Sequence, residues 1–151
     1  MGEVPGDRAG LLLAADALYG LAAWAVRWHP REISLTAVST MATLARTGPR
    51  RITDLAVSEG VTQPSMTALV GTLVRSGLAE RRADPRDQRV VLVALSDAGS
   101  EHLRAHRQAA TDQFATAIGK LAPEETDALL AAAPAFRHLL ELAVGRGNAR
   151  S

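Results

Sequence analysis

The sequence predicts a mainly α-helical chain with one small β-hairpin. Alanine and leucine are abundant among the 151 residues and only 3% are aromatic, a balance that favours helices over strands. One run rich in β-branched residues, Val90-Val91-Leu92-Val93-Ala94-Leu95, follows a charged, turn-rich stretch and predicts the hairpin. Hydrophobic residues make up 47% and charged residues 22% of the chain, which is typical of a globular protein.

The composition excludes several classes of protein. The chain has no cysteine, which excludes disulfides, thiolate catalysis and cysteine-ligated zinc. Seventeen Lys and Arg against sixteen Asp and Glu leave a net charge of +1, so no strong field draws a partner of either sign. The small positive excess falls in residues 33–99, which carry eight cations and six anions.

The first predicted helix runs from about Asp7 to Trp28. It is apolar on more than one stripe, which predicts more than one neighbour to bury against. Its apolar run, 11–26, is shorter than the roughly 20 residues that span a bilayer and contains Asp16. Glu3 and Asp7 give the preceding segment the wrong charge for a secretory signal. We therefore expect a cytoplasmic protein with no membrane partner.

Three shorter helices are predicted next. Ser34 or Thr36 caps the second helix, which runs to about Arg46. Its predicted inward positions are Val38, Met41, Ala42 and Ala45. Thr53 caps the third helix, which covers about 54–59.

The fourth helix and the hairpin follow. Thr62 caps the fourth helix and Gly77 ends it. Its apolar stripe consists of Met66, Leu69, Val70 and Leu73. Residues 78–82 and 90–95 are the predicted strands, separated by a charged, turn-rich tip at 83–89.

Two long helices complete the chain. Ser96 caps a fifth helix that runs to about Gly119, and Ala122 and Pro123 open a sixth. The sixth helix carries the apolar stripe Leu129, Leu130, Ala133, Phe136, Leu139, Leu140 and Ala143. Together with the apolar first helix, this stripe exposes more apolar surface than one small lobe covers, which predicts an obligate homodimer.

Three short helices followed by a hairpin with a charged tip predict a winged helix-turn-helix. The turn at 58–62 joins the third and fourth helices at the length that this motif uses. The fourth helix is then the recognition helix for the major groove of double-stranded DNA. Its predicted DNA-contacting residues are Thr62, Gln63, Ser65, Thr67 and Arg75. The hairpin tip places Arg86 and Arg89 near the adjacent minor groove.

Three stretches of the sequence carry a resemblance to a known family. They are Ile52-Thr53-Asp54-Leu55-Ala56, Val61-Thr62-Gln63-Pro64-Ser65-Met66-Thr67, and a run from Gly77-Leu78-Ala79-Glu80-Arg81 through Asp84-Pro85-Arg86-Asp87-Gln88-Arg89 to Leu95-Ser96-Asp97-Ala98-Gly99. The last run resembles the G-L-x-x-R…D-P-x-D-x-R…L-[ST]-x-x-G wing signature of the MarR (multiple antibiotic resistance regulator) family of bacterial transcription factors. The resemblance covers about residues 35–103. It implies a dimer made by the terminal helices, a palindromic operator, and a repressor released by a small aromatic effector bound near the first helix.

The recognition helix departs from the family pattern. Ala68 stands where the family often carries arginine, and Gly71 and Thr72 stand where charged residues are common. Arg75 is the only cation in this helix. An alternative function therefore remains open, namely a dimeric winged-helix interaction module with only weak or non-specific DNA binding.

The arginines near the hairpin have two interpretations. In this order of elements, we expect Arg86 and Arg89 to contact DNA. In an isolated hairpin, the same arginines would be solvated charges balanced by nearby acidic residues. Asp87 is expected to orient Arg89 rather than to touch DNA, because phosphate would repel its carboxylate. Arg50 and Arg51, just ahead of the third helix, either contact phosphate or are solvated.

Aromatic residues near the end of the first helix form the candidate effector site. Trp24, Trp28 and His29 either pack in the core or in a dimer interface, as large aromatic side chains usually do, or form the wall of an effector pocket. Tyr19 and Met41 are the further candidate members of that pocket.

No catalytic constellation is present in the sequence. It lacks G-x-S-x-G, a phosphate-binding glycine loop and H-E-x-x-H, so we expect neither enzyme activity nor a cofactor. His102 and His106 share a helix face, but no third ligand follows at a telling spacing and no metal is expected. The predicted organisation is a DNA-binding lobe at 33–99 and a dimerisation region made of 1–32 and 100–151.

Overall fold

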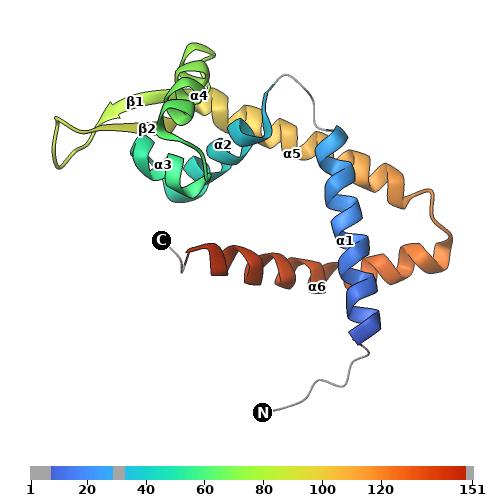
Figure 1. The fold of residues 1–151 in the computed structure, drawn as a ribbon. Helices are drawn as coiled ribbons and strands as arrows, with labels where there is room; N and C mark the ends of the chain where they lie inside the picture. The colour runs from blue at the N-terminus through green and yellow to red at the C-terminus, as the bar shows by residue number, and fades with distance from the viewer. Residues whose placement is uncertain (1–7, 29–32, 149–151) are drawn as a thin grey trace.

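The computed structural model describes residues 8–28 and 33–148 and confirms the mainly α-helical fold with one hairpin (Figure 1). The elements are, in order, α1 (Arg8–Trp28), α2 (Leu35–Thr47), α3 (Ile52–Ser58), α4 (Gln63–Arg75), β1 (Ala79–Ala83), β2 (Val91–Leu95), α5 (Asp97–Ile118) and α6 (Pro123–Asn148). The helix caps at Thr62 and Ser96 are as predicted, and Ser34 is the cap of α2 out of the two predicted candidates. Each side chain accepts a hydrogen bond from a backbone N–H in the first turn.

The buried core lies between α2, α3, α4 and the hairpin. Its fully buried apolar side chains are Met41, Leu55, Met66, Val70 and Val93. Ile33 and Leu103, which lie outside these elements, pack against it with other half-buried residues. Burial of one such side chain contributes about 1.5–3 kcal/mol. This shared core therefore fixes the positions of α3, α4 and the hairpin relative to one another.

The face of α2 that turns inward differs from the predicted one. The buried residues are Ala37, Thr40, Met41 and Leu44, whereas Ala42 and Ala45 are exposed and Val38 is half-buried. The prediction was right for Met41 and wrong for Ala42 and Ala45, because alanine occurs on both the buried and the exposed sides of α2 and does not mark its inward face. The buried Thr40 is tolerated because its hydroxyl donates a 2.8 Å hydrogen bond to the carbonyl of Thr36.

The start of α3 also differs from the prediction, since the helix begins at Ile52 and Thr53 is not its cap. Arg50 forms an antiparallel bridge with Val93 of β2, through backbone N···O distances of 2.9 and 2.7 Å. The chain stays extended as far as Arg51 because of this bridge, and the helix begins directly after it. A pairing between segments so far apart in the sequence leaves no local pattern that would predict it.

The hairpin pairs β1 with β2 in an antiparallel register that runs from Ala79–Leu95 to Ala83–Val91. Each strand begins one residue later than predicted. Because Arg50 bridges to the other side of β2, this strand has backbone partners on both edges. The base of the hairpin is thereby anchored, while its tip extends beyond the core (Figure 1).

The long helix α5 extends away from the core, and α1 and α6 lie outside the core (Figure 1). Many large apolar side chains on α1 and α6 are exposed, including Leu11, Leu12, Leu13, Tyr19, Leu130, Phe136, Leu139 and Leu140. Among the described residues, α1 is also the one helix that is long and apolar enough to cross a membrane, with 19 residues (Arg8–Val26) at a mean hydropathy of 1.6. This segment is longer than the apolar run on which the sequence prediction relied, so length does not distinguish α1 from a membrane span.

Candidate nucleic-acid interface

The N-terminal end of α4 presents the predicted polar side chains to solvent. Thr62, Gln63, Ser65 and Thr67 are all exposed. The hydroxyls of Thr62 and Ser65 share a 2.8 Å hydrogen bond, and the Thr67 hydroxyl donates to the Gln63 carbonyl at 2.8 Å. The side-chain amide of Gln63 makes no hydrogen bond within the described part of the chain. Of these four side chains, the Gln63 amide therefore has the most donors and acceptors available for a base edge.

Arg75, the only cation of α4, lies back along its own helix. Its Nη2 donates to the Thr72 hydroxyl at 2.9 Å. A Cβ atom built at Gly71 would lie 3.3 Å from its Nη1, so the absent side chain leaves room for the guanidinium. Gly71 lowers the helix propensity of α4, and its missing side chain allows Arg75 to lie against the helix surface.

The tip of the hairpin is shaped by two aspartates that accept hydrogen bonds from backbone N–H groups two residues ahead. Asp84 Oδ1 accepts from the N–H of Arg86 at 2.8 Å, and Asp87 Oδ1 accepts from the N–H of Arg89 at 3.0 Å. Such Asx turns fix the backbone of a loop without any packed core. Asp87 Oδ1 also pairs with Arg89 Nε at 3.2 Å, so Asp87 orients Arg89 as predicted.

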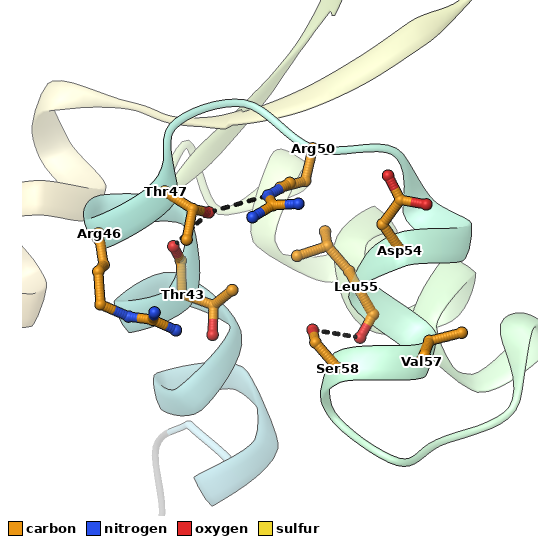
Figure 2. A pocket seen from close by; sticks show the side chains of 8 residues that line it. All are labelled: Thr43, Arg46, Thr47, Arg50, Asp54, Leu55, Val57 and Ser58. Carbon is orange, nitrogen blue, oxygen red and sulfur yellow. Dashed lines mark hydrogen bonds between the residues drawn. The ribbon is translucent and has the colours of Figure 1, made fainter. Parts of the chain in front are cut away.

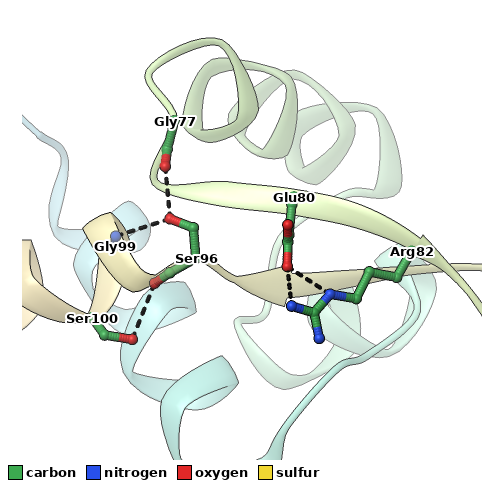
Figure 3. Close-up of polar contacts among 6 residues, drawn as sticks. All are labelled: Gly77, Glu80, Arg82, Ser96, Gly99 and Ser100. Carbon is green, nitrogen blue, oxygen red and sulfur yellow. Dashed lines mark hydrogen bonds and ion pairs between the residues drawn. The ribbon is translucent and has the colours of Figure 1, made fainter.

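The four hairpin arginines differ in their surroundings. Arg82 is paired with Glu80 of the same strand (Figure 3). Arg81 and Arg86 have no ion-pair partner among the described residues. The side chain of Arg89 is 92% exposed even though it is paired with Asp87. The tip therefore offers the guanidinium groups of Arg86 and Arg89 to solvent from a backbone that their own neighbours hold in place.

A hollow of about 560 Å³ lies between the C-terminal part of α2 and α3 (Figure 2). It is lined by Thr43, Arg46, Thr47, Arg50, Asp54, Leu55, Val57 and Ser58. Arg50 Nε donates to the Thr47 hydroxyl at 3.1 Å, and the Thr47 hydroxyl donates to the Thr43 carbonyl at 2.8 Å. The Arg50 guanidinium is thus held in a defined direction beside the hollow, and the neighbouring Arg51 is exposed. The sequence signalled the charges but not the hollow, which needs α2 and α3 in contact.

The structure does not bring the predicted effector residues together. Met41 is fully buried in the core because it lies on the inward face of α2, and it does not join Trp24. Tyr19 is 75% exposed on α1. His29 and the side chain of Trp28 lie outside the described residues.

Trp24 has partners on α5 that the sequence did not indicate. It lines a shallow hollow of about 270 Å³ together with Gln113, Thr116, Ala117 and Lys120. Lys120 is the only lysine in the sequence, a signal too weak to connect it with a tryptophan so far away along the chain. An aromatic face, an ammonium group and two polar side chains suit a small aromatic anion.

A tight turn joins α3 to α4, the polar N-terminal end of α4 is exposed, and the hairpin has a cationic tip. Together these features define a winged helix-turn-helix protein of the DNA-binding class. The model of the MarR family matches residues 33–91. The HTH-type transcriptional regulator Mb0904 of Mycobacterium bovis is 35% identical over 109 residues, which cover 72% of this chain and 76% of that protein. The chain belongs to the MarR family and is a transcriptional regulator.

Solved structures of low sequence identity share the fold. The transcriptional regulator Tm0710 from Thermotoga maritima superposes with a TM-score of 0.75 at 18% identity, covering 89% of this chain and 98% of that one. A mutant of MepR from S. aureus bound to an oligodeoxyribonucleotide has a TM-score of 0.63 at 19% identity, covering 91% of this chain and 99% of that one.

Proposed function

We propose that this regulator is a cytoplasmic repressor that binds a palindromic operator as a homodimer and is released by a small aromatic effector. The observation that carries the DNA-binding part is the pairing of an exposed polar helix end at 62–67 with a rigid tip that presents Arg86 and Arg89. The DNA-bound MepR mutant, which shares the fold, supports this arrangement.

The recognition helix reads bases mainly through Gln63. A glutamine amide bonds an adenine edge through both a donor and an acceptor in the major groove. Thr67 contributes less as a donor because its hydroxyl proton is already given to the Gln63 carbonyl. Thr62, Ser65 and Arg75 contact the phosphate backbone or water around the same groove, since hydroxyls and guanidinium groups bond phosphate readily.

The hairpin tip and the segment ahead of α3 supply the ionic part of binding. Arg86 and Arg89 enter the adjacent minor groove, where narrow A·T-rich DNA attracts guanidinium groups. Arg51 contacts a phosphate, and the oriented Arg50 beside the hollow of Figure 2 contacts a neighbouring phosphate. In the sequence, these arginines lie before and after α4.

The dimer forms through residues 1–32 and 100–151, leaving 33–99 as the DNA-binding lobe. The exposed apolar side chains of α1 and α6 support this division, because so many large apolar side chains left exposed mark an interface. A lipid bilayer would also cover this apolar surface. The assignment of α1 to a dimer interface is therefore tested by whether the protein stays soluble without detergent. A stable, detergent-free dimer favours the repressor, whereas extraction only by detergent favours a membrane anchor.

A second candidate function is an interaction module with weak DNA binding. It is favoured by Ala68 and Gly71, because neither residue has a side chain long enough to reach a base. Selection of bound fragments from genomic DNA, followed by titration at physiological salt, separates the two functions. We expect a palindromic fragment bound at least about a thousandfold more tightly than random DNA. Binding without any such preference would support the interaction module.

A further inference from the structure

The recognition helix, the hairpin and α5 meet at one junction, shown in Figure 3. The chain passes through it twice, first at Gly77 and Leu78 between α4 and β1, and again at Ser96 between β2 and α5. The backbone N–H of Ser96 donates to the carbonyl of Leu78 at 3.2 Å. The two passes are therefore hydrogen-bonded directly beyond the last paired residues of the hairpin.

The Ser96 hydroxyl makes two hydrogen bonds that join different elements. It donates to the carbonyl of Gly77 at 2.6 Å, and it accepts from the backbone N–H of Gly99 at 2.9 Å (Figure 3). The second bond is an ordinary helix cap for α5. The first bond reaches the segment that ends α4, where Gly77 adopts a φ of 72°. One hydroxyl thus links the end of the recognition helix to the start of α5.

Gly99 brings the first turn of α5 against the same segment. A Cβ atom at Gly99 would lie 2.0 Å from the carbonyl oxygen of Leu78 and 2.8 Å from Cδ1 of Leu95. Real Cβ atoms do not approach other atoms so closely, so only glycine allows this backbone contact. The contact sets the distance between α5 and the hairpin base, and the Ser96 hydroxyl adds a directional bond to it.

We propose that Ser96 is a positioning residue for DNA binding, whose hydroxyl fixes the angle between the recognition helix and α5. This inference rests on the proposed dimer, in which α5 connects the DNA-binding lobe to the partner. The 22 residues of α5 span about 33 Å, so a tilt of about 5° at Ser96 would move its far end by about 3 Å. Two recognition helices must meet half-sites about 34 Å apart, and an error of that size would weaken operator binding.

Removal of the hydroxyl is compared with removal of a matched cap elsewhere. Ser34 caps α2 by accepting from the N–H of Ala37 at 3.2 Å, and no hydrogen bond of its hydroxyl to another element occurs in the described structure. We expect both Ser96→Ala and Ser34→Ala to lower the melting temperature, and Ser96→Ala to lower it more because it also loses the bond to the Gly77 carbonyl. Only Ser96→Ala should lower operator affinity, by about tenfold. Each subunit of the bound dimer loses the hydrogen bond that aligns its recognition helix with α5. Ser96→Thr, which keeps a hydroxyl, should restore wild-type binding.

A further variant keeps the cap of α5, so that a loss of DNA binding is not explained by unfolding. Ser96→Asp can accept from the Gly99 N–H but cannot donate to the Gly77 carbonyl. It should fold and lose more affinity for the selected operator than for a scrambled duplex, whereas simple charge repulsion would weaken both equally. Wild-type operator affinity in Ser96→Ala, with the melting temperature lowered at least as much as in Ser34→Ala, would overturn the positioning role. If the wild-type protein selects no operator at all, the proposed repressor function itself fails.

Discussion

The indole of Trp24 in α1 meets the phenyl ring of Phe114 in α5 edge to face, with centroids 5.2 Å apart and ring planes at 75°. Aromatic pairs of this geometry contribute about 0.5–1.5 kcal/mol beyond their burial. The pair joins α1 to the helix that begins at the hairpin base. Trp24 therefore has a packing role, and the same side chain also faces the hollow that contains Lys120.

The hollow beside Trp24 predicts coupled effects of an aromatic anion. Sodium salicylate should quench tryptophan fluorescence and weaken operator binding over the same concentration range, and Lys120→Ala should reduce both effects because it removes the cation. Operator DNA should lower salicylate affinity by the same factor, since coupling between two ligands is reciprocal. Trp24→Phe and Trp28→Phe report which indole is quenched. Quenching that leaves DNA affinity unchanged would restrict Trp24 to packing.

The Asx turn at Asp87 predicts an effect opposite to simple electrostatics. Asp87→Ala removes a negative charge close to DNA, yet it should lower DNA affinity because Arg89 loses both its backbone and its side-chain partner. Asp87→Asn keeps an acceptor for the Arg89 N–H and should bind at least as well as wild type. Fluorescence anisotropy with a labelled operator measures both variants. Tighter binding by Asp87→Ala would show that the turn does not matter for the contact.

The exposed tip predicts that the hairpin supplies most of the ionic binding. Each phosphate contact adds about −0.9 to the slope of log affinity against log salt concentration, and a dimer doubles each contact. Arg89→Ala should therefore reduce the magnitude of the slope by up to about 2. Gln63→Ala should leave the slope nearly unchanged and reduce the preference for operator over scrambled DNA, with a smaller loss for Thr67→Ala. A wild-type slope for Arg89→Ala would leave that guanidinium as a solvated charge.

The exposed apolar face of α1 predicts that the folded protein requires its partner. Removal of residues 1–28 should give aggregated or unfolded chain, because the exposed apolar side chains of α6 then lose the α1 part of the proposed dimer interface. Light scattering and circular dichroism measure the outcome, with full-length protein as the reference. A soluble, folded monomer from the truncated chain would contradict an obligate dimer.

The close contact at Gly99 predicts a position-specific loss of stability. Gly99→Ala should destabilise the protein by about 1–3 kcal/mol, the usual range for overpacking, because the new methyl group meets the backbone of Leu78. Gly119→Ala is the control, since its Cβ would lie at an ordinary 3.5 Å from the nearest atom and its φ is −64°. It should be stabilising by about 0.4–1 kcal/mol. Denaturant unfolding compares the two variants, and equal stabilities would contradict the close approach of Gly99 to Leu78.

The elements of the fold were predictable because their signals are local. Caps such as Ser96, the glycines that end helices, and the run of β-branched residues from 90 to 95 each act within a few residues, and the structure has them nearly where expected. The D-P-x-D-x-R pattern was equally informative, since Asp84 and Asp87 bond to backbone groups only two residues away. These features fix the fold class and the place of the candidate interface.

Contacts between distant segments were decided only by the tertiary structure. The sequence did not show that Arg50 bridges to β2, or that Trp24 meets Phe114 and the hollow containing Lys120. The inward face of α2 was only partly predictable, because alanine occurs on both its buried and its exposed sides. Local hydrogen bonding and periodicity specify where helices and strands form, whereas the choice among apolar faces depends on which neighbours arrive to cover them.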